Sequence, residues 1–329
     1  MARVERTRAI VVERAGGPEV LAWSEVELAP PAAGELRIRH TAVGLNFIDV
    51  YQRTGFYPPP RWPHVPGLEA AGVVEAVGAG VAGLAPGDRV AYATSPSGAY
   101  AQRRNLTAAL CVRLPSGVPD ELAAAALLKG LTAHYLVRRV FRVEAGHTLL
   151  VQAASGGVGT LLCQWAARLG ARVIGTVSTE AKAERAREFG CHEPIVTTRE
   201  DFAARVRELT GGRGCQVVYD SIGKDTFDRS LECLAPRGLL VSYGQSSGPV
   251  PPFDLLRLSK TSGFITRPTL FAYTSTRAEL ESGASELFDL LASGALRQPI
   301  ESRVPLAEAA RAHRDLESRR TVGATVLVP

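Results

Sequence analysis

The second half of the chain alternates short apolar runs with helical stretches, and this alternation constrains the fold more than any other feature. The apolar runs are TLLVQAA, ARVIGTV, EPIVTT, CQVVYDSI and GLLVSYG, and between them lie TEAKAERAREFG, EDFAARVRELTGG and DTFDRSLECLAP. β-type runs that alternate with helices of about 10 to 15 residues indicate βαβ units, in which parallel strands form a sheet covered by helices. The sequence therefore predicts an α/β fold with a doubly wound parallel sheet over residues 127–265.

Residues 1–126 differ in texture and predict a second, β-rich domain. The runs TRAIVVER, ELRIRHTAVGL, AAGVVEAVGAGV and DRVAYA alternate with turn segments such as PPP and APGD, which is typical of a barrel-like domain. After residue 266 the chain adds a long helix, TRAELESGASELFDLLASGAL, and two strands, IESRVPL and GATVLVP. The 329 residues fit two domains of roughly 150 residues each. We expect residues 1–126 and 266–329 to form one domain and residues 127–265 the other.

The composition indicates which partners and which cellular compartment to expect for this protein. The net charge is +5, but only four of the 38 basic residues are lysine, and the arginines are scattered among acids rather than gathered in one run. A scattered excess is typical of a solvated surface, so we expect no nucleic-acid partner. The five cysteines are widely spaced without a C-x-x-C, and no apolar run approaches the ~20 residues of a membrane span. These features favour a cytoplasmic protein with free thiols and no membrane anchor.

The stretch VQAASGGVGTLLCQ, from Val151 to Gln164, carries a glycine-rich turn that follows a predicted strand and begins a helix. In a dinucleotide-binding fold this turn holds the pyrophosphate on the free N–H groups of the helix N-terminus. Gly156 lets the backbone approach the anion, Gly159 lets the helix pack on the strand, and a small alanine replaces the usual first glycine. Glycines required only by a tight turn are the alternative. The predicted cofactor contacts are Ala154, Ser155, Gly156, Gly157 and Val158.

The end of the next predicted strand decides which dinucleotide fits. An NAD site offers an acid there to the ribose 2′-hydroxyl. This chain instead has Gly175, Ser178 and Lys182 in IGTVSTEAKAE, with no acid before Glu180. A hydroxyl and an ammonium suit a 2′-phosphate, and one charge-assisted hydrogen bond of about 1.5 to 3 kcal/mol corresponds to a roughly 10- to 100-fold preference. We therefore expect NADPH, and the alternative is that Lys182 is only a surface lysine.

A series of motifs extends over essentially the whole chain. In order they are GGPEVL, VGLNFIDVYQRTGFYPPP, PGLEAAGVVEAVGAGV, PGDRVAY, LLKGLTAHYL, AASGGVG, GTVSTEAKA, VVYDSIG, GLLVSYGQSSG and ESRRTVGATVLVP. Together they resemble the zinc-independent quinone oxidoreductases, the zeta-crystallin-like members of the medium-chain dehydrogenase/reductase superfamily. The resemblance implies a GroES-like catalytic domain made from both ends of the chain, a Rossmann NADPH-binding domain inserted between them, and a homodimer.

The ligands of a catalytic zinc are missing from the places where related alcohol dehydrogenases hold them. Such a zinc needs three protein ligands and an open position. Where the dehydrogenases have a cysteine and a histidine, this chain has Asn46 in VGLNFID and Leu68 in PGLEAAG, and the four-cysteine structural lobe is absent. We therefore expect no metal. Quinones and enones accept hydride without a Lewis acid because conjugation delocalises the charge, so they are favoured over simple alcohols and carbonyls.

The resemblance places the catalytic pocket on Asn46, Tyr51, Tyr57 and Thr132. Asn46 and Thr132 would hold the nicotinamide ribose and amide, and the tyrosines would supply a flat wall and a phenol for the acceptor. Tyrosines that only pack at a domain edge, beside a rigid YPPP turn, are the alternative.

The same resemblance extends the cofactor site beyond the glycine turn. Relatives often carry a tyrosine beside the 2′-phosphate, and this chain has Thr197 there, so we expect NADPH to be preferred with some use of NADH. Nearby Arg199 could compensate for the missing ring. Arg319 would close over the cofactor, unless it is only part of a charged helix end. The further predicted cofactor contacts are Ser221, Tyr243, Gly244, Gln245, Ser246, Thr266, Arg267 and Pro268.

Three functions follow from these features. An NADPH-dependent quinone reductase leads, and a reductase of α,β-unsaturated ketones or aldehydes that uses the same pocket is the nearest alternative. A non-enzymatic structural or RNA-binding role, as in some zeta-crystallin-like relatives, is the third. Other chemistry is disfavoured: Cys163 lies among apolar residues of a predicted helix, and no G-x-S-x-G elbow follows a strand. Among the histidines only His134, close to Thr132, is placed to relay a proton.

Overall fold

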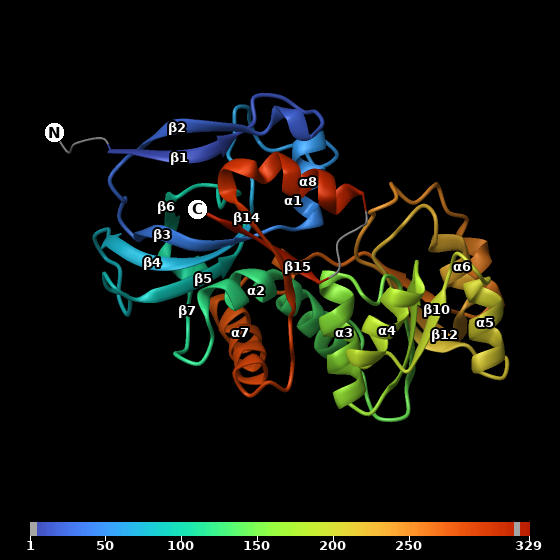
Figure 1. Ribbon diagram of the computed structural model, residues 1–329. Helices are drawn as coiled ribbons and strands as arrows, with labels where there is room; N and C mark the ends of the chain where they lie inside the picture. The colour runs from blue at the N-terminus through green and yellow to red at the C-terminus, as the bar shows by residue number, and fades with distance from the viewer. Residues whose placement is uncertain (1–4, 319–322) are drawn as a thin grey trace. The chain divides into compact units, whose positions relative to one another are not determined.

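The computed structural model in Figure 1 describes residues 5–318 and 323–329. The chain forms two compact units. The first consists of the segment up to Leu128 and the segment from Thr274 onward, and the second is Lys129–Tyr273. Helix α2 (Asp120–Tyr135) runs from the first unit into the second. Within the described residues, no helix has the length and apolar character required to cross a membrane.

The first unit contains a mostly antiparallel sheet in the strand order β14-β15-β3-β4-β5-β7, with β6 paired to β3. Strands β14 and β15 are its one parallel pair among the described strands. A separate hairpin is formed by β1 (Glu5–Val11) and β2 (Ala22–Leu28), visible in blue in Figure 1. The strands of the sheet are β3 (Glu35–Gly44), β4 (Glu69–Val77), β5 (Arg89–Ala93), β6 (Arg103–Thr107), β7 (Val112–Arg113), β14 (Ile300–Pro305) and β15 (Ala324–Val328).

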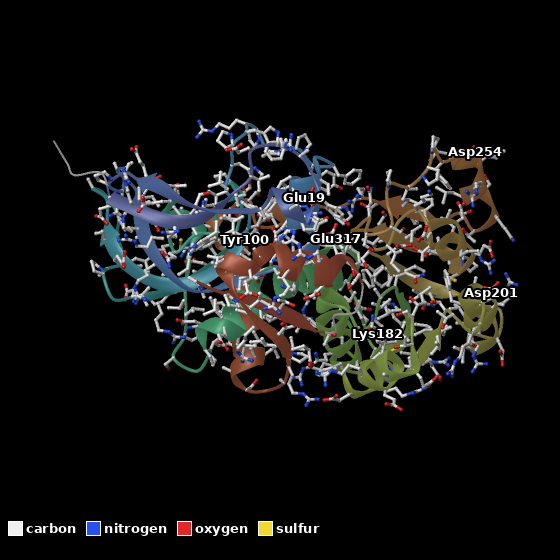
Figure 2. All side chains as sticks on the ribbon, turned by 45° about the horizontal axis from the view of Figure 1, so that its top comes forward. Glu19, Tyr100, Lys182, Asp201, Asp254 and Glu317 are labelled. Carbon is white, nitrogen blue, oxygen red and sulfur yellow. The ribbon has the colours of Figure 1, made fainter. Side chains whose placement is uncertain are left out.

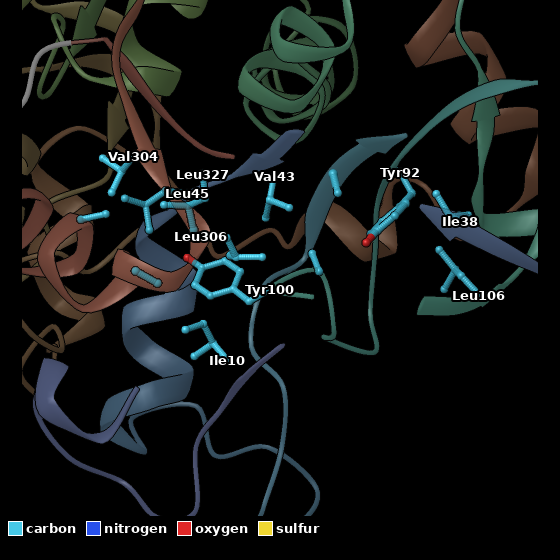
Figure 3. Close-up of a cluster of buried hydrophobic side chains, with 14 of the residues drawn as sticks. Ile10, Ile38, Val43, Leu45, Tyr92, Tyr100, Leu106, Val304, Leu306 and Leu327 are labelled. Atoms are coloured by element: carbon cyan, nitrogen blue, oxygen red, sulfur yellow. The ribbon is translucent and has the colours of Figure 1, made fainter. Parts of the chain in front are cut away.

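Helices of the first unit join or cover these strands. The α-helices are α1 (Phe47–Thr54), α7 (Arg277–Ala292) and α8 (Ala309–Glu317), and the 3-10 turns are η1 (Pro18–Val20), η2 (Ala108–Leu110) and η6 (Leu306–Glu308). The core lies between sheet, hairpin and α8, and Figure 3 shows the Tyr100 ring beside Ile10 and Leu306 within it. Each such aliphatic side chain contributes about 1.5 to 3 kcal/mol when fully buried.

The second unit is a six-stranded sheet in the order β10-β9-β8-β11-β12-β13, and every strand pair in it is parallel. The α/β prediction is therefore confirmed. Its strands are β8 (Thr148–Val151), β9 (Arg172–Val177), β10 (Glu193–Val196), β11 (Cys215–Asp220), β12 (Leu234–Ser242) and β13 (Phe264–Thr266). Its helices are α3 (Gly157–Arg168), α4 (Glu180–Glu188), α5 (Phe202–Leu209) and α6 (Phe227–Glu232), with shorter turns η3 (Leu136–Val140), η4 (Leu255–Lys260) and η5 (Leu270–Ala272).

The parallel arrangement determines where the unit offers a binding site. Strand β8 is almost wholly buried, as expected of a central strand, and all the strands end at the same edge of the sheet. Helices begin just after these ends with side-chain caps: Thr179 accepts a hydrogen bond from the Lys182 amide, and Asp201 accepts from Ala203 and Ala204. Ligands of open α/β sheets bind at this carboxyl edge.

One predicted helix is shorter than expected. The stretch DTFDRSLECLAP is helical only over Phe227–Glu232, and Leu234 already begins β12. The strand was expected later, at GLLVSYG. Pro236 supplies the physical reason, because a proline disfavours the helical conformation of the residue before it and removes a helical N–H.

Candidate cofactor and acceptor sites

The glycine-rich turn joins β8 to α3 at the carboxyl edge of the parallel sheet. Gly156 is the N-cap of α3, with an extended backbone at φ −76° and ψ 172°. A Cβ on Gly159 would lie 2.2 Å from the carbonyl oxygen of Ala153, so only glycine allows this helix to approach the turn so closely. The first N–H groups of an α-helix have no intrahelical acceptor, and they form an anion site when glycine leaves room in front of them. This geometry fits the pyrophosphate of a dinucleotide.

Ala154 lies at the base of the turn and is fully buried. Its amide donates to the Thr176 carbonyl at 3.0 Å. Gly175, on the adjacent β9, makes the approach feasible, because a Cβ there would lie 2.5 Å from the Ala154 Cβ and 2.7 Å from the Cys191 Sγ. A small residue at 154 and a glycine at 175 therefore complement each other in packing. The predicted residues Ser155 and Gly156 follow directly in the turn, and Gly157 and Val158 are the first two residues of α3.

The end of β9 carries the groups predicted to recognise a 2′-phosphate. Ser178 is exposed, and Lys182 lies half-buried on α4, where Figure 2 labels it. Thr197 is adjacent, since its hydroxyl donates to the Val177 carbonyl at 3.2 Å.

Arg199 and Glu180 form an ion pair near the same place. The guanidinium Nη1 lies 2.8 Å from the Glu180 Oε2, and both side chains are largely exposed. The first acid after β9 is therefore held by an arginine, which lowers the local negative charge that would oppose a phosphate. Arg199 was expected to compensate for the missing ring beside the 2′-phosphate, and in the structure its guanidinium contacts Glu180. Because both side chains are exposed, this ion pair contributes little to stability.

The loops after β11 and β12 meet at the same edge. The Tyr243 amide donates to the Asp220 carbonyl at 2.8 Å and the Ser246 amide donates to the Ser221 carbonyl at 3.2 Å. A Cβ on Gly244 would lie 2.6 Å from the Ser221 carbonyl oxygen, so these two loops touch through their backbones. The predicted residues Ser221, Tyr243, Gly244, Gln245 and Ser246 are thus brought together.

The remaining predicted cofactor residues have more varied positions. Thr266 ends β13 beside Val241, and Arg267 follows it and donates to the Ser242 carbonyl at 2.7 Å, with Pro268 next. Thr132 is buried in the part of α2 that belongs to the second unit. Arg319 lies outside the described residues.

In the first unit, Asn46 is fixed between two buried carboxylates. It is the N-cap of α1, and its backbone amide donates to the Asp49 Oδ2 at 2.9 Å. Its side-chain amide donates to the Glu69 Oε2 at 2.8 Å, while the other Glu69 oxygen accepts from the Leu128 amide at 2.6 Å. Asp49 and Glu69 were not among the predicted site residues. The N-x-x-D spacing of a capping box is the sequence signal that identifies Asp49.

Asp49 is also the end of a buried hydrogen-bonded chain. The Tyr100 hydroxyl donates to the Asp49 Oδ2 at 3.1 Å, and the His313 Nε2 lies 3.0 Å from that hydroxyl. The Nδ1 of His313 lies 3.1 Å from the Arg53 Nη1, and Arg53 also makes a bidentate pair with Glu317. Because the guanidinium can only donate, His313 accepts at Nδ1 and carries its proton on Nε2.

The buried surroundings of this hydrogen-bonded row keep His313 neutral. Burial, together with the adjacent Arg53 guanidinium, lowers the pKa of His313 to about 3. Burial likewise raises the pKa of the Tyr100 phenol well above its ordinary value. A neutral imidazole and a neutral phenol therefore link the buried charges of Arg53 and Asp49, and they fix the start of α1 and the amide of Asn46.

The predicted tyrosines belong to an aromatic cluster on and after α1. Tyr51 packs against Phe47, Phe56 and Tyr57 with ring centroids 5.3 to 5.5 Å apart. Phe56 and Tyr57 are 38% and 36% exposed, which is high for such large apolar rings. Phe47 and Phe56 were not predicted as site residues. The i, i+4 spacing of Phe47 and Tyr51 on a helix is the signal that joins them.

No cluster of ligands suited to a metal forms among residues 5–318 and 323–329. In those segments no three His, Cys, Asp or Glu side chains come together in a group that could hold an ion. Leu68, at the place where relatives with zinc have histidine, is buried. Cys163 is also buried, and its pKa is raised well above its ordinary value by the hydrogen bond that its thiol makes to Cys191 and by burial. A thiol of this kind is a packing group and a poor nucleophile.

Comparison with known proteins places these sites in context. Residues 32–143 match the alcohol dehydrogenase GroES-like domain family, and residues 157–284 match the zinc-binding dehydrogenase family. A quinone oxidoreductase of Pseudomonas aeruginosa is 52% identical over 315 residues, which are 95% of this chain and 97% of that protein. A 2-haloacrylate reductase of Burkholderia is 45% identical over 98% of each chain. The crystal structure of Escherichia coli quinone oxidoreductase with NADPH has a TM-score of 0.96 and 46% identity, and the alignment covers 98% of this chain and 100% of that one.

Proposed function

The chain belongs to the zinc-independent quinone oxidoreductases of the medium-chain dehydrogenase/reductase superfamily, and we propose that it reduces a quinone with NADPH. The similarity over nearly the full length to a quinone oxidoreductase crystallised with NADPH carries this function. The close-packed turn at Gly156 and Gly159 supports it independently, because that turn leaves room for a phosphate at the α3 N-terminus. The protein therefore functions as an oxidoreductase whose reductant is a dinucleotide.

The second unit supplies the cofactor-binding residues. The backbone from Ala154 to Val158 would hold the pyrophosphate, and Ser178 with Lys182 would hold the 2′-phosphate. The cofactor, when bound, supplies a hydride from its nicotinamide. Thr197 provides no ring to cover the adenosine, so NADPH is preferred while NADH is tolerated.

The first unit supplies the acceptor site. Asn46 is held by its hydrogen bonds to Asp49 and Glu69 and would position the nicotinamide end of the cofactor. The Tyr51 and Tyr57 rings meet edge to face at 81°, and the partly exposed ring of Tyr57 would offer a flat apolar surface to a planar quinone, with its hydroxyl as the donor to the quinone oxygen. The residues here orient and bind, and the conjugated acceptor takes the charge without a resident metal.

Lys182→Ala tests which cofactor is preferred, and Arg213→Ala is its control. Arg213 is an exposed basic residue in the α5–β11 connection, away from the carboxyl edge of the sheet. We expect Lys182→Ala to raise the dissociation constant of NADPH about tenfold and to leave that of NADH within about twofold, since one charge-assisted bond is lost. Arg213→Ala should change neither. Equal weakening of both cofactors would show that Lys182 does not contact the 2′-phosphate.

Reduction of an activated alkene is the second candidate. It is favoured by the 45% identity to a 2-haloacrylate reductase, a protein named for an α,β-unsaturated substrate. Tyr57→Phe distinguishes the acceptors. Loss of the phenol should raise KM for 1,4-benzoquinone several-fold, and an effect confined to a 2-alkenal would move the assignment to the alkene reductases.

A homodimer and a cytoplasmic setting complete the proposal. Strand β13 is an edge of the parallel sheet, and Phe264 on it is 60% exposed; Leu255 and Leu256 are 74% and 73% exposed in the same unit. Large apolar side chains on an open strand edge favour pairing with a second copy of the chain. Light scattering should give twice the chain mass for the wild type and a smaller mass for Phe264→Glu; a monomeric wild type would refute the dimer.

The five cysteines are all free and buried, which fits a reducing compartment.

A further inference from the structure

A buried chain of hydrogen bonds runs beneath the glycine-rich turn and ends on a carboxylate. Its four side chains are Gln152 directly after β8, Thr176 on β9, Ser230 on α6 and Asp220 at the end of β11. Each is 0 to 2% exposed. None of these side chains was predicted as functional, and none reaches the surface where a ligand would bind. Their chain begins at the backbone amide of Ala153, the second residue after β8.

The direction of every bond in this chain is fixed. The Ala153 amide donates to the Thr176 Oγ1 at 3.2 Å, and that hydroxyl donates its only proton to the Gln152 Oε1 at 2.5 Å. The Gln152 amide donates to the Ser230 Oγ at 3.0 Å, and Ser230 donates to the Asp220 Oδ2 at 2.8 Å. Because each hydroxyl has one proton, only this orientation satisfies all four groups.

Asp220 anchors the far end. Its Oδ1 accepts from the Ile222 and Gly223 amides at 2.8 and 3.0 Å, and the Thr226 hydroxyl also donates to the carboxylate. The acceptor is therefore charged and held by the turn that follows β11. Bonds to an ionised acceptor are stronger than bonds between neutral groups, and linked bonds polarise one another.

The backbone at the near end is strained. Ala153 has φ +56°, the left-handed conformation that costs a residue with a Cβ roughly 1 to 2 kcal/mol, a factor of about 5 to 30 in population. Its carbonyl accepts from the Gly156 amide at 2.9 Å and is the group against which Gly159 packs. The conformation of Ala153 therefore determines where the α3 N-terminus points.

We propose that Thr176 is a positioning residue for cofactor binding, which acts with Gln152, Ser230 and Asp220 to hold Ala153 in its left-handed conformation. Thr176 holds the turn twice, through its hydroxyl at Ala153 and through its carbonyl at the Ala154 amide. It does not touch the cofactor. It keeps the free N–H groups of α3 in the orientation that receives the pyrophosphate. This inference rests on the proposed use of NADPH.

The test uses Thr176→Val, which keeps the shape of the side chain and removes its hydroxyl. We expect the dissociation constant of NADPH, measured by calorimetry, to rise about tenfold, with kcat at saturating NADPH within twofold of wild type. Thr176→Ser keeps the hydroxyl and should restore the affinity. Adding Ala153→Gly to Thr176→Val should also restore it, because glycine adopts a positive φ without support.

Thr210→Val is the matched control. Thr210 is also buried in the second unit, and its hydroxyl bonds only to the backbone of the α5 end and of Gly214, away from the turn. It should lower stability without changing the affinity for NADPH. Hydrogen exchange gives a second readout: the amides of residues 154–160 should exchange faster in Thr176→Val and return to the wild-type rate when Ala153→Gly is added.

Several outcomes would overturn the inference. They are an unchanged affinity in Thr176→Val, an equal loss in Thr210→Val, or no restoration by Ala153→Gly. If Thr176→Val does not fold, Ser230→Ala cuts the chain farther from the turn and should weaken NADPH binding about two- to threefold; no change there would overturn it as well. A wild-type protein that binds no NADPH would instead refute the proposed function.

Discussion

Mild acid should destabilise this protein through two buried histidines that the native state keeps neutral. His313 has a pKa lowered to about 3 by burial and by Arg53, and His40 has a pKa lowered to about 4, chiefly by burial. Both are almost wholly buried and satisfied as neutral rings: His40 donates from Nδ1 to the Ala101 carbonyl at 2.6 Å and accepts from the Tyr92 hydroxyl at 2.8 Å. Protonation would remove the acceptor nitrogen of each ring.

The linkage between proton binding and folding gives the sign and the size of this change in the free energy of unfolding. The unfolded chain binds a proton at each histidine near the ordinary pKa of 6.5, whereas the native chain does not until far lower pH. Stability is therefore retained above pH 6.5 and lost as the pH falls toward 4 and 3. At pH 5.5 each histidine favours the unfolded state by about 1.4 kcal/mol, or about 3 kcal/mol for both. This value does not depend on the native pKa as long as it lies well below 5.5.

Urea unfolding at pH 7.5 and at pH 5.5 measures the effect. His313→Gln keeps one donor and one acceptor but cannot titrate, so the difference in unfolding free energy between the two pH values should shrink by about 1.4 kcal/mol. His40→Gln should shrink it by the same amount, and the double variant by the sum. A His313→Gln protein with the full wild-type pH dependence would show that native His313 is already protonated at pH 5.5, which would contradict this prediction.

Three further predictions concern packing, charge and the metal. Gly159→Ala should unfold more easily by at least about 2 kcal/mol and bind NADPH weakly, because its Cβ would lie 2.2 Å from a backbone oxygen. Thermal melts and titrations check this against Gly117→Ala, whose Cβ would meet Ala292 at an ordinary 3.4 Å. Arg53→Met should lower the free energy of unfolding in urea by about 3 kcal/mol, because the buried hydrogen bonds that run from Asp49 through Tyr100 and His313 then lack their cation. Glu317→Gln should lower it less, because the Glu317 side chain is one-third exposed. Dialysis against a chelator should leave NADPH oxidation unchanged, and recovery of a lost rate by added zinc would contradict a metal-free reaction.

The sequence predicted the features that depend on local pattern. Alternating strands and helices gave the parallel sheet, and the glycine turn was placed at the β8–α3 junction, because periodicity and turn residues are local signals. The end of α6 was misjudged, since Pro236 acts on the residues before it. Asn46 was identified by resemblance, but its partner Glu69 is distant in sequence and no local signal joins them.

What escaped prediction depends on tertiary contacts. Gln152 lies in the turn after β8, and Thr176, Ser230 and Asp220 lie on β9, α6 and β11, so nothing in their spacing shows that their side chains meet. The left-handed backbone of Ala153 is equally hidden, because alanine gives no sign of a positive φ. Such positions are set by the fold as a whole and are found where a site needs a conformation that the sequence alone disfavours.

Absorbance at 340 nm measures directly whether this protein oxidises NADPH with a quinone. NADPH and then NADH are mixed with the protein and 1,4-benzoquinone, 9,10-phenanthrenequinone, a 2-alkenal or a simple aldehyde, with and without chelator. We expect oxidation of NADPH by the quinones that is slower with NADH, absent with the simple aldehyde and insensitive to chelator. Turnover of the alkenal alone, or activity that chelator abolishes, would contradict it.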